Sequence, residues 1–200
     1  MIANSSYIRS FEEISDEFIF VKEKLKTKFS YYKKIVENGC SIPSAGNYVI
    51  FSQASEIDSI YRRLELEINR KYTFEIVSSF EAKCVYYFKR TLKRNSSLGT
   101  LFRNEVSVAK IRGDKHLMFQ DLIKVFKIYI HPNNPIAYSQ FKNLVEYRNW
   151  IAHGRGWELP DHLTSTEEDF ISDKYDFDSS YSLIFGVIDE LPDFPNNLQR

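Results

Sequence analysis

Apolar side chains recur at steps of three and four residues along most of this chain, and that period constrains the fold more than any other feature. In residues 7–37 lysine and glutamate fill the intervening positions, and the apolar series is Phe11, Ile14, Phe18, Val21, Leu25, Phe29 and Tyr32. Because one face of an α-helix returns about every 3.6 residues, this spacing predicts a long amphipathic helix. Gly39 and Pro43 are expected to end it.

The same criterion predicts four further helices, over residues 52–70, 73–93, 116–130 and 136–152. No strong helix breaker lies between Arg70 and Thr73, so the first two are also compatible with one continuous helix. This order of helices and short connections is typical of an up-and-down helical bundle.

The end of the chain has a different character. Residues 157–178 are acidic and predicted to form a loop, whereas residues 181–191 fit either a helix or a strand. We therefore expect an all-α fold in two parts: a bundle over residues 1–155, and an acidic C-terminal extension, residues 156–200, packed on or beside it.

The formal net charge of zero conceals an asymmetry between these parts. Residues 1–150 carry 24 Lys and Arg against 16 Asp and Glu, whereas residues 151–200 carry 3 against 11. A basic body attracts a polyanion such as RNA, and an acidic segment can lie across that surface or repel RNA from it. Charge alone, however, favours the simpler interpretation that both are ordinary solvated faces.

Several classes of protein are not expected from this sequence. No apolar run approaches the length of a membrane span, and the first 14 residues lack the basic-then-apolar layout of a signal peptide. Cys40 and Cys84 are far apart and have no ligand spacing, so neither a disulfide framework nor a metal site is predicted. The expectation is a cytoplasmic protein without a cofactor.

The stretch from residue 141 to residue 155 contains the one constellation that suggests chemistry. On a helix a single apolar stripe would comprise Phe141, Leu144, Val145, Ile151 and Ala152. Arg148 falls in this stripe, and its guanidinium cannot lose its charge, so it must meet a carboxylate or face a cleft or an interface. Asn149 and His153 are four residues apart and share a neighbouring face, and Gly154 is expected to stop the helix.

The sequence Arg148-Asn149-x-x-Ala152-His153 resembles the Arg-x4-His signature of the HEPN superfamily, whose members are helical bundles with this motif on a late helix. Glu81 resembles the acidic position that many HEPN proteins keep on an earlier helix facing the motif. Some HEPN toxins extend the motif to Arg-x4-His-x-Tyr, and their antitoxins modify that tyrosine. Here Arg155 occupies the position, so this mode of control is not expected.

The resemblance implies a metal-independent endoribonuclease in which two protomers bring their motifs together across a two-fold axis. His153 would transfer protons, Arg148 would bind the phosphate, and Asn149 would orient the phosphate or the imidazole. It also implies a homodimer, RNA as substrate, and a toxin–antitoxin or anti-phage setting with a possible antitoxin or defence-system partner protein.

Two alternatives remain open. One is a non-catalytic HEPN-like module that dimerises or binds RNA or a nucleotide. The other is an unrelated helical interaction protein, in which His153 would be buried and Arg148 would be locked to Glu81 or Glu146.

Residues 89–115 form the most basic stretch and are the candidate path for RNA. The residues that we assign to RNA binding are Lys89, Arg90, Lys93, Arg94 and Arg103, together with Arg155 after the motif. Phe102 lies among them and could stack on a base. A solvated helix end with its loop explains the same charges equally well. The acidic residues 158–178 would restrain activity if they covered this basic face.

Overall fold

The computed structural model describes residues 8–40, 42–43, 50–51, 53–94, 96–106, 117–155, 158–167 and 170–194. Its α-helices are α1 (Phe11–Glu37), α2 (Ala54–Thr91), α3 (Ser97–Glu105), α5 (Phe119–Ile130), α6 (Pro135–Ala152) and α7 (Phe177–Asp189). Two short antiparallel hairpins pair β1 (Ile42–Pro43) with β2 (Ile50–Phe51) and β3 (Thr164–Glu167) with β4 (Phe170–Asp173). Helices dominate the structure, so the predicted all-α fold class is confirmed.

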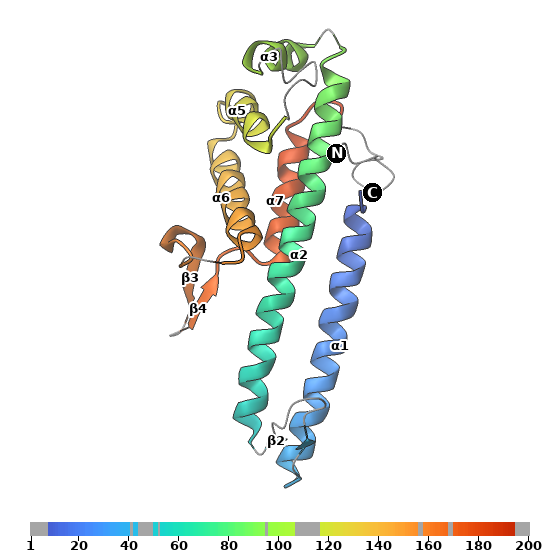
Figure 1. Cartoon of the computed structure of the whole chain (residues 1–200), viewed down its shortest axis with the longest axis vertical. Helices are drawn as coiled ribbons and strands as arrows, with labels where there is room; N and C mark the ends of the chain where they lie inside the picture. The colour runs from blue at the N-terminus through green and yellow to red at the C-terminus, as the bar shows by residue number, and fades with distance from the viewer. Residues whose placement is uncertain are drawn as a thin grey trace.

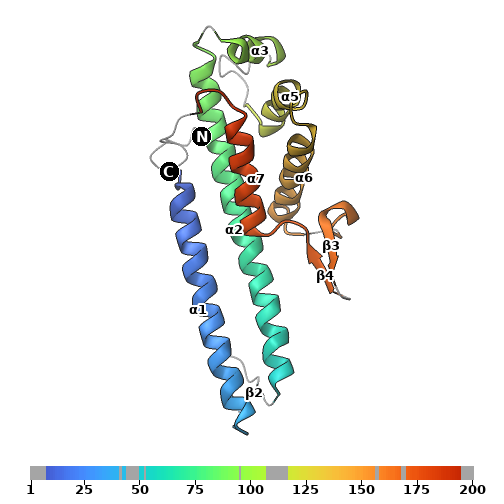
Figure 2. The ribbon, with the colours of Figure 1, turned by 180° about the vertical axis from the view of Figure 1, so that it is seen from behind.

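The two long helices run side by side in opposite directions and form the spine of the molecule (Figures 1 and 2). The start of α1 is set by Ser10, whose hydroxyl accepts from the Glu13 amide at 3.0 Å while the Glu13 carboxylate accepts from the Ser10 amide at 2.9 Å. The segment predicted as one helix or two is a single continuous helix, α2, of 38 residues. At a rise of roughly 1.5 Å per residue it is about 57 Å long.

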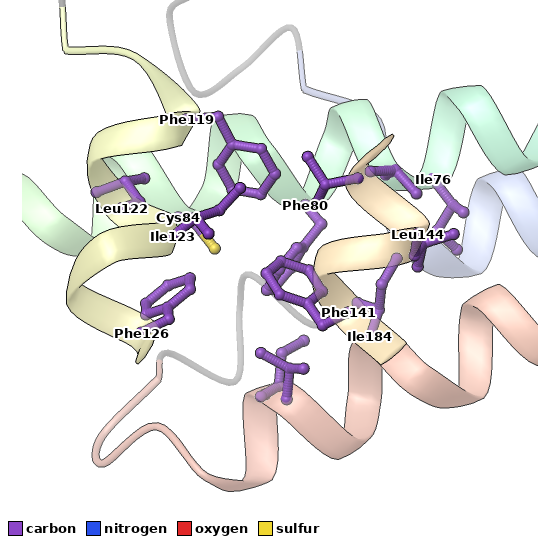
Figure 3. Packing of buried hydrophobic residues seen from close by; sticks show 14 of the residues in the cluster. Ile76, Phe80, Cys84, Phe119, Leu122, Ile123, Phe126, Phe141, Leu144 and Ile184 are labelled. Carbon is purple, nitrogen blue, oxygen red and sulfur yellow. The ribbon is translucent and has the colours of Figure 1, made fainter. Parts of the chain in front are cut away.

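The shorter helices pack against the C-terminal half of α2 (Figures 1 and 2). Phe80 of α2 lies where these helices meet. Its ring centroid is 5.6 Å from that of Phe141 in α6, 6.4 Å from that of Phe119, the first residue of α5, and 6.5 Å from that of Phe11 in α1. Figure 3 shows Phe80, Phe119 and Phe141 together with Ile184 of α7. All four of these core residues and Ile184 are at most 6% exposed, so the bundle has one continuous apolar interior.

Beyond this core α1 and α2 continue as a two-helix projection, which we call the arm and define as residues 22–37 and 54–66 (Figure 1). A second, smaller apolar cluster around Phe29 and Ile57 holds its two helices together. Lys33 of α1 bonds to Asp58 of α2 at 2.8 Å across the same interface. The outer faces of the arm are not covered by any other helix of the described chain.

The end of the chain is more ordered than its acidic composition suggests. Residues 181–191 fitted a helix or a strand, and the structure has a helix there, α7, with Ile184, Val187 and Ile188 buried in the main core. The loop predicted over residues 157–178 is wrong in part, because residues 164–173 form the β3–β4 hairpin. The division of the chain at residue 155 stays a prediction. Among the described residues, no helix is both long enough and apolar enough to cross a membrane.

Candidate functional site

Helix α6 carries the motif, and both of its ends are set by local sequence. It begins after Asn134, whose side-chain oxygen accepts from the Ala137 amide at 3.1 Å, with Pro135 in the first turn. At its other end Gly154 has φ +70°, its amide bonds back to Ile151, and the next amide, of Arg155, bonds back to Trp150. This is a Schellman ending, so the predicted stop at Gly154 is confirmed.

Arg148 is held against α2 by contacts on several sides. Its NH2 nitrogen lies 2.8 Å from Oε2 of Glu81, and its Nε donates to Oγ of Ser78 at 3.3 Å. The guanidinium carbon also lies 5.3 Å from the centroid of the Phe74 ring. Its NH1 donates to Oδ1 of Asn149 at 3.0 Å. The charge that looked out of place on an apolar stripe therefore has a carboxylate partner.

Burial governs the electrostatics of this ion pair. The side chains of Arg148 and Glu81 are only 21% and 26% exposed, and Oε2 of Glu81 has no aligned hydrogen bond to any described residue despite its closeness to Arg148. Loss of solvent raises the pKa of the Glu81 carboxyl, and attraction to Arg148 lowers it by less, so the pKa lies above its ordinary value. Glu81 thus anchors Arg148, but its attraction to Arg148 offsets only part of the cost of removing the carboxylate from water.

His153 stands at the end of the same helix, as the residue that follows its last turn. Its backbone amide bonds to the carbonyl of Asn149 at 3.0 Å, and its side chain is exposed to solvent. The structure therefore brings Arg148, Asn149 and Glu81 into contact and presents His153 about one turn further along. Of the two features expected for an unrelated interaction protein, the locked Arg148 is present, whereas the buried His153 is not.

Arg155 follows directly and has φ +58°, a left-handed conformation that non-glycine residues seldom adopt. Its NH1 nitrogen lies 2.5 Å from Oε1 of Glu67 on α2. This ion pair holds the chain beyond Gly154 against α2. Arg155 is thus at the His153 end of α6, as its place in the sequence requires, and already has an acidic partner.

Sequence reasoning missed a cluster beside the motif that ties the β3–β4 hairpin to the bundle. Asp173, the last residue of β4, accepts from Nε and NH2 of Arg70 at 2.6 and 2.9 Å and also from the hydroxyl of Tyr147. The guanidinium of Arg70 lies 5.2 Å from the centroid of Trp150, whose side chain is buried. Burial is the largest influence raising the pKa of Tyr147, and nearby Asp173 raises it further. No local signal in the sequence marks Asp173 as the partner of residues so distant.

The predicted basic path for RNA lies away from the His153 end of α6. Lys89, Arg90, Lys93 and Arg94 are exposed at the C-terminal end of α2, where Arg94 pairs with Asp193 at 3.2 Å. Arg103, on α3, donates to the carbonyl oxygens of Leu92 and Arg94. Residues 95 and 107–115 of this stretch lie outside the described residues.

Two features weaken this path as a route to His153. Lys89 is 22 residues beyond Glu67 on α2, which is about 33 Å at roughly 1.5 Å per residue, and Glu67 is where Arg155 binds. The expectation that Phe102 stacks on a base is wrong, because α3 turns its ring into the core. It is fully buried there, 3.8 Å between centroids from Phe88.

No group of three or more histidine, cysteine, aspartate or glutamate side chains in the described parts of the chain is arranged to hold a metal ion.

Comparisons of the chain with protein-family models, with curated proteins and with solved structures gave no match. The case for a function therefore rests on the residues of α6 and their surroundings.

Proposed function

We propose that this chain is a HEPN-type endoribonuclease that cleaves RNA without a metal ion, at a site built from two copies of the chain. The observation that carries the proposal is the arrangement on α6. A half-buried Arg148, anchored by Glu81 and bonded to Asn149, stands about one turn before an exposed His153 at the helix end. A fixed cation and a solvent-accessible imidazole on the same helix suit reaction at a phosphodiester.

The chemistry needs only groups that this chain and its substrate possess. The 2′-hydroxyl of RNA attacks the adjacent phosphorus as one imidazole accepts its proton, and the bond to the 5′-oxygen breaks as a second imidazole donates a proton to it. The products are a 2′,3′-cyclic phosphate and a 5′-hydroxyl. Arg148 would stabilise the negative charge on the phosphoryl oxygens. Since Oδ1 of Asn149 accepts from Arg148, its amide nitrogen would serve as the donor to the phosphate.

The dimer is part of this proposal because the reaction uses two proton-transfer groups and each chain supplies one His153. A two-fold axis beside α6 would bring both imidazoles to one phosphate. Mixing wild-type protein with His153→Ala protein should then lower activity more steeply than dilution alone. A linear loss of activity would show that each chain works by itself.

The decisive experiment is cleavage of end-labelled total RNA in EDTA by the wild-type protein, by His153→Ala and by a matched control, His131→Ala. His131 is also exposed and lies next to the other end of α6. We expect cleavage by the wild type and by the control, and none by His153→Ala. Cleavage that survives the His153 substitution, or that needs an added divalent ion, would overturn the proposal.

A second candidate is supported by the ion pair itself. Because Arg148 already has Glu81 as a partner, it could be structural, and the chain could be a module that dimerises or binds RNA or a nucleotide without cleaving it. A folded dimer that binds RNA but leaves it intact would favour this second function. The setting that we propose for the enzyme is toxin–antitoxin or anti-phage defence, in which a partner protein would restrain or trigger it.

A further inference from the structure

The charge of α1 reverses halfway along the helix. Residues 11–21 contain four acidic residues and no basic one, whereas residues 22–34 contain six lysines and a single glutamate. The second half belongs to the arm, beyond the main core. The paired helix does not balance this charge, since residues 54–66 of α2 contain two arginines against three acidic residues.

Exposed aromatic rings accompany these lysines on the outer face of α1. Phe20, Lys24, Thr27, Tyr31 and Lys34 succeed one another at steps of three and four residues and are all exposed, Phe20 and Tyr31 to 62%. The opposite face of the helix, with Leu25 and Phe29, packs against α2. A shallow groove runs along the outer face, lined by Glu23, Lys26, Thr27, Ser30, Tyr31 and Lys34.

Three of the lysines are available to an external anion. Within the described parts of the chain no carboxylate lies within ion-pair distance of Lys24, Lys26 or Lys34, in contrast to Lys33, which is bound to Asp58. The ammonium group of Lys24 lies 5.4 Å from the centroid of Phe20. The face thus offers cationic groups and flat rings in alternation.

The register of the two long helices places the first lysines of this face at the level of the His153 end of α6. Arg148 lies further along α2, at Ser78 and Glu81, opposite the first turns of α1. Glu17 of α1 bonds to Tyr72 of α2, and Lys33 bonds to Asp58, so the lysine-rich half of α1 lies opposite the part of α2 between these contacts. Glu67, which binds Arg155, belongs to that part. In Figures 1 and 2 α1 and α6 flank α2 on opposite sides, so a ligand that touches both must cross α2.

We propose that the outer face of α1, with Lys24, Lys26, Tyr31 and Lys34, binds single-stranded RNA and leads it toward His153. Lysines attract the phosphodiester backbone, and exposed rings stack on unpaired bases without regard to sequence. An anionic membrane surface would need an apolar face to insert, but the apolar face of this half of α1 is used against α2. This inference rests on the proposed ribonuclease function, because that function defines RNA as the ligand.

The test measures binding of a labelled single-stranded RNA oligonucleotide by fluorescence anisotropy, with full-length His153→Ala protein so that the RNA stays intact. The arm variant carries Lys24→Glu, Lys26→Glu and Lys34→Glu. The matched control carries the same charge change at exposed lysines on α5 and α6, as Lys124→Glu, Lys127→Glu and Lys142→Glu. A milder variant, Tyr31→Ala, keeps every charge, and circular dichroism verifies that all variants are folded.

We expect the arm variant to bind RNA at least about 10-fold more weakly than the control and to reduce the salt dependence of log Kd by about 2, at roughly 0.7 per phosphate contact on a single strand. Tyr31→Ala should weaken binding about 10-fold through the loss of one stacked base. Equal affinity of the arm variant and the control, or no binding of RNA by the parent protein, would overturn the inference. So would arm-dependent binding to phosphatidylserine vesicles without arm-dependent binding to RNA.

The two proposals fail separately. If the wild type cleaves RNA and the arm substitutions change neither affinity nor cleavage of the oligonucleotide, the arm proposal falls and the ribonuclease stands. If the arm substitutions abolish binding but the wild type never cleaves, the arm is an RNA-binding surface of a non-catalytic module.

Discussion

Replacing Arg148 and Glu81 separately and together would distinguish a structural ion pair from a catalytic arginine. Arg148→Met removes the guanidinium but keeps an unbranched side chain, and among the described residues it leaves the Glu81 carboxylate without a cation within ion-pair distance. Glu81→Leu removes the opposite charge. Lys142→Met, at an exposed position on the same helix, is the control for a change of charge on α6.

The size of the effect follows from the burial of the pair. Breaking a fully buried ion pair costs about 3–5 kcal/mol, but both side chains keep about a quarter of their surface exposed. We therefore expect Arg148→Met to lower the free energy of unfolding by about 2 kcal/mol. Glu81→Leu should cost about 1 kcal/mol, because Arg148 retains Ser78 and Asn149 as partners. The double variant should lie within about 1 kcal/mol of wild type, giving a coupling energy of about 2 kcal/mol.

The stability of Arg148→Met should depend on pH, and the direction of this dependence follows from the pKa of Glu81. The pKa of Glu81 is raised by burial, and without Arg148 it should rise further, because the attraction that lowers it is gone. The folded state then holds the proton more tightly than the unfolded state, so folding is favoured at low pH and loses stability as the pH rises through the raised pKa. The penalty of Arg148→Met should accordingly shrink as the pH is lowered from neutral toward the ordinary carboxyl range.

Denaturant unfolding and RNA cleavage are measured on the same four proteins and on the control. If Arg148 binds the scissile phosphate, the double variant recovers stability but not cleavage. A double variant that cleaves RNA at the wild-type rate would refute the catalytic assignment. Additive stability effects without coupling would refute the ion pair as an energetic unit.

Three further outcomes are expected. Lys83 is 2% exposed and burial lowers its pKa from 10.5 to about 8, which corresponds to a cost of about 3 kcal/mol at pH 7 at about 1.4 kcal/mol per pKa unit. Contact of its ammonium with the Phe11 ring, 3.9 Å from the centroid, offsets part of this cost, so Lys83→Met should be more stable than wild type at pH 7 by about 1–2 kcal/mol. Since the unfolded state binds the extra proton between these pKa values, that advantage should vanish by about pH 10.5 in denaturation curves. In Gly154→Ala the added Cβ meets no atom within 4 Å, but the residue must keep φ at +70°. Thermal unfolding should therefore show a free energy of unfolding lower by about 1 kcal/mol. Asp173→Asn breaks the two-bond ion pair with Arg70, whose side chain is 17% exposed, and should cost about 3 kcal/mol. Limited proteolysis should then cut first in the β3–β4 hairpin, and cleavage elsewhere would contradict this role of Asp173.

Much of the fold could be predicted because the signals for a helix, its apolar spacing and its end residues, lie within a few residues of one another in the sequence. The apolar period and the end signals predicted residues 136–152 as a helix, and α6 runs from Pro135 to Ala152. The same reasoning found α5 but began it at residue 116, whereas the structure begins it at Phe119. The sequence does not distinguish one helix from two in α2, because helix propensity is a weak signal that tertiary packing often overrides.

The candidate site divides in the same way. That Arg148 needs a partner follows from its charge and its place on an apolar stripe, but the residues alone leave both Glu81 and Glu146 as candidates. Because α6 packs on α2, the partner of Arg148 is Glu81. The Glu146 carboxylate instead lies 3.4 Å from Nε2 of His162. The sequence also gave no reason to pair Asp173 with Arg70, since 103 residues separate them.

The helices, the stop at Gly154 and the arginine, amide and imidazole on one helix follow from local sequence, because they depend on residues within a turn or two of each other. Tertiary packing settles which carboxylate meets Arg148, that the ring of Phe102 is buried, and that the first lysines of the arm lie near the level of Glu67, which binds Arg155. Those outcomes depend on which helix faces pack together. Packing is a property of the whole chain, and no local pattern of residues contains it.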